Sequence, residues 1–205
     1  MKIRRSMSAQ RDSGQALMET VLMMPLLLAV VLNAINFAFF FLMALNITSS
    51  ARSSGTYSIM GGATPATIAM PPAGPVTTTT SVSYIAYQDL TGAVYTPSTA
   101  NTGVQVCSPS VGVLNAGTAT QQSSCVRGDT GSIGTFPAAE PDPELNSAGT
   151  VPAFLLNRVD VAYQFRPPIP LMPFNIIILA SPACSSSGGV VTCLFYRHTE
   201  MRAMN

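Results

Sequence analysis

The chain has 205 residues, enough for one domain of ordinary size together with a membrane anchor, and its formal net charge is +1. Such a nearly neutral chain lacks the positive field that gathers DNA or RNA, so the composition argues against nucleic-acid binding. Charged side chains make up only 9% of the residues, against about 25% in ordinary globular domains. A surface this poor in charge is usual for exported proteins and packed assemblies.

Residues 1–14 form a short basic leader. Its charges are almost all positive and are opposed only by Asp12; the basic residues are Lys2, Arg4, Arg5 and Arg11. By the positive-inside rule, the N-terminus is predicted to stay in the cytoplasm and the chain after the anchor to lie outside it.

Residues 15–51 are predicted to form a helix that spans the membrane and continues beyond it. No side chain from Thr20 to Ala51 is charged, and a helix of this length extends for about 48 Å. Roughly 20 residues are enough to cross the hydrocarbon core, so the run is more than sufficient. It is also too long for the core of a secretory signal, which has about 7 to 15 residues.

Several residues inside this helix differ from a plain anchor. Pro25 removes one backbone hydrogen bond and predicts a kink or a softened turn. Asn33 and Asn36 are polar groups at bilayer depth, and Ala34 and Ala38 form a small-xxx-small pair that allows a second helix to approach. These residues are either variation that any anchor tolerates or a face for a partner helix, and the sequence leaves both interpretations open.

The apolar run begins with GQALME, from Gly14 to Glu19. A carboxylate in lipid costs about 2.5–3.5 kcal/mol at the centre of a helix on insertion scales, and less near the edge. If the chain is cut after Gly14, the new α-amino group of Gln15 on a neighbouring helix can pair with Glu19 and fix the register of packed helices. Alternatively, Glu19 reaches the headgroups from a fixed anchor. Cyclisation of Gln15 after cleavage would remove the amine and weaken the pairing.

The order of a basic leader, Gly14, Gln15, Glu19 and Pro25 resembles the TadE-like family, the pseudopilin-like proteins of tight-adherence (Flp) pilus assembly. The helix exit NITSSARSSGTY, residues 46–57, is similar as well. The resemblance is weaker in VDVAYQFRPPIPLMP and in the final TEMRAMN, which are similar to the closing strands of that family.

This resemblance implies cleavage after Gly14 by a prepilin peptidase, which makes Glu19 the fifth residue of the mature chain. It also implies partners among other pilin-like subunits or pilus assembly proteins, reached through the N-terminal helix. Major Flp pilins are much shorter and carry an aromatic residue after the glutamate, where this chain has Thr20. The resemblance therefore implies a minor or accessory component.

Beyond the helix, residues 52–80 are predicted to be a linker, because residues 61–80 are rich in Pro, Gly and Thr. Residues 81–205 are predicted to form a small, loop-rich, mainly antiparallel β domain outside the cytoplasm, so the fold class is α+β. Strands are expected at 81–88, 103–107, 158–165, 174–180 and 189–202.

In the predicted strand 158–165, Val159, Val161, Tyr163 and Phe165 share one face, and Asp160, Ala162 and Gln164 take the other. Three prolines, Pro167, Pro168 and Pro170, end this strand. The last two strands are expected to pair as a hairpin, and residues 108–150 are expected to form long loops.

All four cysteines, Cys107, Cys125, Cys184 and Cys193, lie beyond the anchor. An even number outside the cytoplasm favours disulfides, for which four cysteines allow three connectivities. We favour the local pairs Cys107–Cys125 and Cys184–Cys193, which close the glycine-rich loop and brace the hairpin. A metal site fits less well because the spacings differ from those of zinc ribbons and the chain has one histidine.

No arrangement in the sequence indicates catalysis. His198, the single histidine, has Arg197 and Glu200 as neighbours, which favours a surface charge cluster over a catalytic site. Nucleophile-elbow, phosphate-loop and metalloprotease motifs are absent from the sequence. The acidic residues 140–144 favour a solvated turn over a calcium site, and the RGD tripeptide, residues 127–129, favours an ordinary turn over an adhesion motif.

We therefore expect a non-catalytic protein without a cofactor. It is either a pilin-like component that assists pilus assembly or related secretion machinery, or a membrane-tethered binding module whose helix is only an anchor. A tethered hydrolase is the least favoured alternative. The expected location is the bacterial inner membrane, crossed once, with the C-terminal domain in the periplasm.

Overall fold

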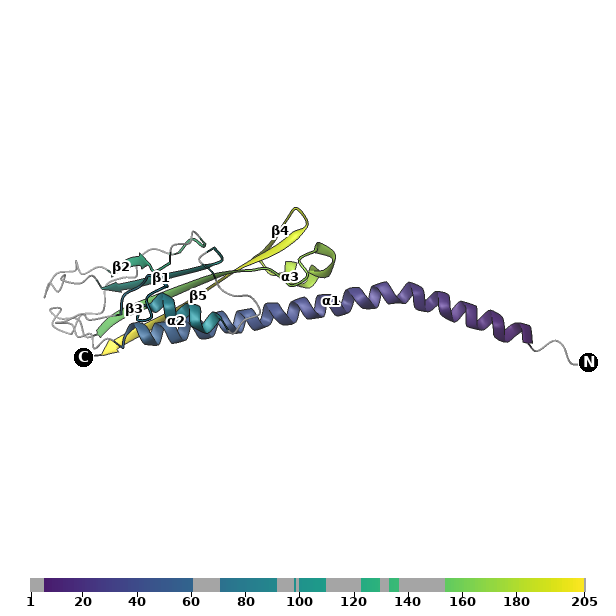
Figure 1. Ribbon diagram of the computed structural model, residues 1–205, viewed down its shortest axis with the longest axis horizontal. Helices are drawn as coiled ribbons and strands as arrows, with labels where there is room; N and C mark the ends of the chain where they lie inside the picture. The colour runs from purple at the N-terminus through teal and green to yellow at the C-terminus, as the bar shows by residue number, and fades with distance from the viewer. Residues whose placement is uncertain are drawn as a thin grey trace, which may run out of the picture.

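The computed structural model describes residues 6–60, 71–91, 98, 100–109, 123–129, 133–136 and 154–204. One long helix, α1 (Ser6–Ser58), carries a small antiparallel sheet domain along its C-terminal half (Figure 1). The fold class is therefore α+β, as the sequence predicts. The remaining helices are α2 (Val82–Leu90), the 3-10 turn η1 (Met172–Phe174) and α3 (Ile176–Leu179). The strands are β1 (Thr102–Pro109), β2 (Ser123–Arg127), β3 (Phe154–Phe165), β4 (Cys184–Ser187) and β5 (Val190–Met204).

The five strands form one sheet in the order β2-β1-β3-β5-β4, and every neighbouring pair is antiparallel. The long strands β3 and β5 pair along their whole length, from Phe154 opposite Met204 to Phe165 opposite Cys193. The predicted strands at 103–107, 158–165 and 189–202 are confirmed. Strand β2 is an addition, because it lies in the segment that was predicted to be loops throughout.

The core lies between one face of this sheet and the helices α1 and α2. The apolar face of β3 is almost completely inaccessible to solvent, and its members lie together because alternate side chains of a strand point to the same face. Its residues are Val159, Val161, Tyr163 and Phe165. The helices contribute the side chains that cover this face, chiefly Met43, Ile47, Ala51, Val82, Ala86 and Leu90.

The strand predicted at residues 81–88 is wrong, because Val82–Leu90 form the helix α2. Ser81 starts this helix as its N-cap, and its hydroxyl oxygen accepts a hydrogen bond from the backbone N–H of Tyr84 at 3.1 Å. Val82, Ala86 and Leu90 then recur every four residues and bury one helical face. Over so short a segment, the alternation of serines with apolar residues resembled a strand more than this helical spacing did.

The strand predicted at residues 174–180 is also wrong, because this segment ends η1 and continues into α3. The partner of β5 in the hairpin is instead the four-residue strand β4, joined to it through Gly188 and Gly189. Both glycines have positive φ angles, +58° and +77°, as a two-residue hairpin turn requires. Of the three isoleucines in α3, only Ile178 is buried. The apolar run is therefore not the buried strand that its composition suggested.

Both predicted disulfides are confirmed. Cys107 lies directly opposite Cys125 in the pair β1–β2, and Cys184 lies directly opposite Cys193 in the pair β4–β5. Each bond therefore ties an edge strand of the sheet to its inner neighbour. In the chain-entropy model a cross-link over loops of this size stabilises the fold by about 3 kcal/mol.

The helix α1 is longer at both ends than the predicted range 15–51. It begins at Ser6, inside the predicted leader, and ends at Ser58, inside the predicted linker. It also continues through Pro25 as one gently curved helix (Figure 1). Its last two turns pack closely on the sheet, since a Cβ added at Gly55 would lie 2.9 Å from the Cγ2 atom of Thr199 on β5. The helical part of the predicted linker thus belongs to the domain.

Candidate functional site

From Gly14 onward, the N-terminal half of α1 exposes nearly all of its apolar side chains. From Gly14 to Leu32 no residue is buried, and in Figure 1 no sheet or helix lies beside this part of the helix. The segment Gly14–Ser58 is long and apolar enough to cross a membrane, as judged by length and composition. Residues 14–32 alone extend for about 28 Å, close to the roughly 30 Å of a bilayer core. We call residues 14–32 the exposed segment.

Gly14, Gln15 and Glu19 lie at the start of the exposed segment. All three are exposed, and the side-chain amide Nε2 of Gln15 lies 3.4 Å from Oε1 of Glu19, one helical turn away. A Cβ at Gly14 would meet nothing within 4 Å. The predicted cleavage position and the carboxylate are therefore open to a second protein from all sides.

The sheet domain first meets α1 at Asn33 and Asn36, the two polar residues of the anchor. Nδ2 of Asn33 donates to the carbonyl of Pro173 at 3.2 Å, and its Oδ1 accepts from the N–H of Ile176 at 3.1 Å. Asn36 is fully buried, and its Nδ2 lies 2.9 Å from the carbonyls of Ile169 and Phe174.

Asn175 completes this arrangement from the side of the domain. Its Oδ1 accepts from Nδ2 of Asn36 at 2.9 Å, and its own Nδ2 donates to the carbonyls of Ile169 at 2.6 Å and Leu171 at 2.8 Å. We call Asn33, Asn36 and Asn175 the asparagine junction. Together their amides bond four carbonyls and two N–H groups of the segment 169–176, which has only a short 3-10 turn and one β-bridge of its own.

The asparagine junction alters the interpretation of the helix. Contact with a partner helix stays a prediction for Asn33 and Asn36, but their amides already bond within the chain and face the sheet domain. Ala34 and Ala38, in contrast, are exposed on the other side of α1. The surface left for another helix is thus formed by the small residues and not by the asparagines.

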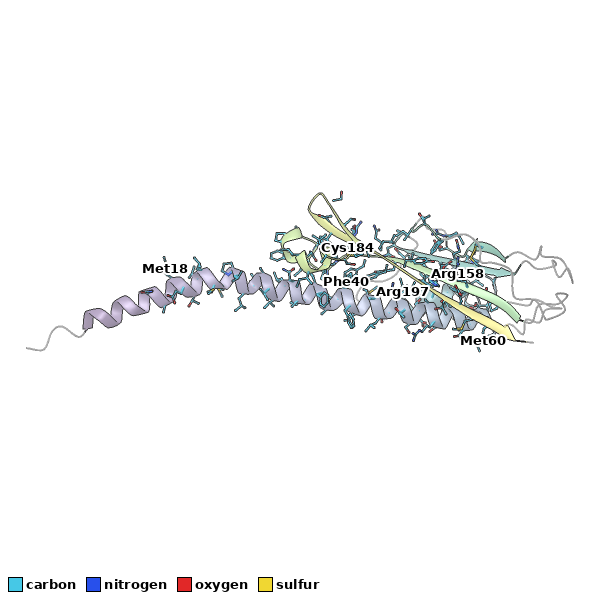
Figure 2. The ribbon with its side chains drawn as sticks, turned by 180° about the vertical axis from the view of Figure 1, so that it is seen from behind. Met18, Phe40, Met60, Arg158, Cys184 and Arg197 are labelled. Atoms are coloured by element: carbon cyan, nitrogen blue, oxygen red, sulfur yellow. A yellow bond between two sulfur atoms is a disulfide. The ribbon has the colours of Figure 1, made fainter. Side chains whose placement is uncertain are left out.

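Beyond the junction, further contacts hold the domain on α1. The ring of Phe40 lies 4.9 Å from that of Phe195 and 6.3 Å from that of Phe165, measured between centroids. Near the far end of the helix, Nδ2 of Asn157 on β3 donates to Oγ of Ser58 at 2.6 Å. Contacts spread over this length make the C-terminal half of α1 part of the domain core; Figure 2 labels Phe40 within this half and Met60 just past its end.

The opposite face of the sheet carries a buried carboxylate that the sequence placed on the polar side of β3. Asp160 is inaccessible to solvent and accepts hydrogen bonds from the hydroxyl of Tyr196 at 2.6 Å and from Nε2 of Gln105 at 3.2 Å. The guanidinium Nε of Arg158 lies 3.2 Å from the same carboxylate. Burial, followed by the bond to Asp160, raises the pKa of Tyr196. A buried and fully bonded acid of this kind is a structural feature.

The charged side chains of the RGD tripeptide are also bonded within the chain. The carboxylate of Asp129 is buried, pairs with Arg127 at 3.0 Å, and accepts from the N–H of Val104 at 2.8 Å. The guanidinium of Arg127 lies 4.6 Å from the ring centroid of Phe136. His198 is exposed on β5, as are its charged neighbours Arg197 and Glu200. The acidic segment 140–144 lies outside the described residues.

Comparison of the chain with protein-family models gave no match, and neither did comparison with curated proteins or with solved structures. The structure therefore defines only a broad class of protein. It is a helix with the length and composition of a membrane span, which carries a sheet domain closed by two disulfides. Such disulfides are typical of a domain in an oxidising compartment.

Proposed function

We propose that this chain is a non-catalytic, TadE-like membrane protein that assists the assembly of a tight-adherence (Flp, type IVc) pilus or of related secretion machinery. The observation that carries the proposal is Glu19, an acid at the start of an exposed apolar helix. An unpaired carboxylate there is costly in lipid, and a positive partner on another helix removes that cost.

In this proposal the basic leader holds the N-terminus in the cytoplasm, and the disulfide-closed domain lies in the periplasm. A prepilin peptidase cuts after Gly14 and frees the α-amino group of Gln15. That amine pairs with Glu19 of a neighbouring pilin-like helix and sets the axial register of the two helices. The exposure of Gly14 and Glu19 supports this scheme, since both the peptidase and the partner must reach them.

The exposed small residues supply the surface along which the helices meet. Ala34 and Ala38 let a neighbouring backbone approach closely, and large apolar side chains surround them. Because the sheet domain is fixed on the same helix, the packing of the helix also sets where the domain is displayed. The domain then contacts pilus or secretion partners without any catalytic step.

The experiment replaces Glu19→Ala and Gly14→Ala in the native host and counts pili by electron microscopy. Membrane fractionation with immunoblotting follows insertion. Both variants are expected to insert normally and to lose most piliation, because each removes one half of the pairing. Met18→Ala is the matched control, since Met18 is exposed and uncharged beside Glu19. Normal pili in both variants would instead favour a tethered binding module whose helix is only an anchor.

A further inference from the structure

Three large apolar side chains are exposed at one end of the sheet domain. Leu171 is 56% exposed, Ile176 is 67% exposed and Ile177 is 53% exposed. They lie before and within α3, at the end of the domain that is nearest to the exposed segment of α1 (Figure 1). We call these three residues the apolar foot. Soluble domains seldom leave such groups together at the surface without a partner.

The asparagine junction fixes the level of the apolar foot along α1. The N–H of Ile176 donates to Oδ1 of Asn33 at 3.1 Å, so α3 lies beside that turn of the helix. Asn33 is about 21 Å along the helix axis from Glu19, which is less than the roughly 30 Å thickness of a hydrocarbon core. A helix that enters the bilayer near Glu19 therefore carries the foot to the outer leaflet.

The other side of α1 has the character of lipid-exposed helix at the same level. Ile35, Phe37 and Phe41 are all exposed there, although they lie beyond the start of the sheet domain. The apolar surface thus surrounds the molecule at this height and does not stop where the domain begins. A bilayer covers such a surface on all sides, whereas one bound protein would cover a single side.

Charge is distributed in the same way. No charged residue occurs between Arg166 and Arg197, so the foot, α3 and the whole turn of the β4–β5 hairpin are uncharged. The nearest charged residue is Arg166, exposed at the end of β3, and the buried acids Asp160 and Asp129 lie farther along the sheet. This sorting matches an end that faces lipid and an opposite end that faces water.

The backbone of the foot is also suited to a medium that offers no hydrogen bonds. Irregular backbone survives at membrane depth only where its polar groups are satisfied by protein. The asparagine junction bonds four carbonyls and two N–H groups of this segment; the carbonyls belong to Ile169, Leu171, Pro173 and Phe174, and the N–H groups to Ile169 and Ile176. The segment therefore meets the condition that irregular backbone at membrane depth must meet.

We propose that the apolar foot docks into the outer leaflet of the same bilayer that α1 crosses, so the domain lies on the lipid surface as well as on its helix. The proposal depends on the insertion of α1 but not on cleavage after Gly14 or on pilus assembly. Two attachments, one spanning and one interfacial, hold the domain at a fixed height and tilt.

The test uses tryptophan fluorescence, because the chain contains no tryptophan. Full-length Ile177→Trp protein is reconstituted at a low protein-to-lipid ratio into vesicles of phosphatidylcholine and phosphatidylglycerol, with and without lipids brominated near the glycerol end of the acyl chain. Two reference variants bracket the result. Leu27→Trp reports a side chain within the exposed segment, and Val126→Trp reports an exposed position on the edge strand β2.

Emission of Ile177→Trp is expected to be blue-shifted and at least about threefold more strongly quenched by brominated lipid than that of Val126→Trp, as for a group buried at the acyl boundary. Quenching no stronger than in Val126→Trp overturns the proposal. A blue shift that grows with protein density without quenching also overturns it, and indicates a second copy of the chain on the foot. Leu171→Trp repeats the measurement from outside α3, and non-reducing mass spectrometry checks both disulfides in each variant.

Discussion

The two halves of α1 are both almost free of charge, yet only one of them packs against the domain. The exposed segment carries large apolar side chains that face away from the domain, whereas the C-terminal half buries Met43 and Ile47 in the core and presents small residues to the sheet in its last turns. The buried positions near its end are Ser50, Ala51, Ser54, Gly55 and Ser58. In these last turns, side-chain size distinguishes the packed helix from the exposed segment better than hydropathy does, because small residues let a backbone approach closely.

The largest effect is expected from a substitution on the buried face of the C-terminal half of α1. Ile47→Ala removes a fully buried side chain and should lower the free energy of unfolding by about 2–5 kcal/mol. Leu45→Ala, two residues away and half exposed, should change it by less than about 0.5 kcal/mol in detergent. Denaturant titration of the full chain, followed by near-ultraviolet circular dichroism, measures both. Equal losses would contradict the assignment of the two faces.

The asparagine junction lies where the two halves of α1 meet. The second-largest effect is expected from its loss. Asn36→Leu removes the donor to the carbonyl of Phe174 and one of the two donors to the carbonyl of Ile169, at a cost of about 2–4 kcal/mol. Amide hydrogen exchange should show faster exchange at Ile169, whose N–H bonds to Oδ1 of Asn36. Ala34→Leu on the opposite face is the control and should leave exchange unchanged. Unaltered protection in Asn36→Leu would contradict the role given to the junction.

A smaller effect tests the close approach at the far end of the helix. Gly55→Leu drives a side chain into Thr199, since even a Cβ would lie 2.9 Å from its Cγ2 atom, and should cost about 1–3 kcal/mol. The double variant Gly55→Leu with Thr199→Ala should recover part of that loss. A double-mutant cycle separates this coupling from the change in helix propensity. Strictly additive losses would mean that the helix and β5 do not meet there.

The smallest effect concerns alkaline pH. Burial, followed by the charge of Asp129, raises the pKa of Tyr87 from 10.0 to about 12. The neutral phenol is thus favoured in the folded state, so its contribution to stability is complete below pH 10 and is lost as the pH rises towards 12. The unfolding free energy of Tyr87→Phe should decline less steeply over this range than that of the unmodified chain. Parallel declines would show that Tyr87 titrates normally.

Much of the fold followed from local patterns. Alternation in residues 158–165 located β3 and separated its two faces, and the preference for local pairs among the four cysteines gave the disulfides that the structure contains. The misassigned segments were short. In α2 the decisive feature was the capping hydroxyl of Ser81, and in α3 it was a contact with Asn33, more than 140 residues earlier in the chain.

The site was predictable only in part. Glu19 could be singled out because an acid beside an apolar run is unusual, and Gly14 because the residues around it resemble those of the TadE-like family. The bonding of Asn36 could not be inferred, because its partners are backbone groups more than 130 residues later in the chain, and only one of them, Phe174, lies in a predicted strand. Its spacing of three from Asn33 and four from Phe40 offered a signal, since all three share the helical face that turns to the domain.

The central claim is that the exposed segment is a processed, pilin-like helix end. The most direct measurement is the intact mass of the protein purified from native membranes that contain an active prepilin peptidase. We expect a chain that begins at Gln15, with both disulfides formed. A chain that still begins at Met1 would contradict the account, because Glu19 would then have no α-amino partner on a neighbouring helix.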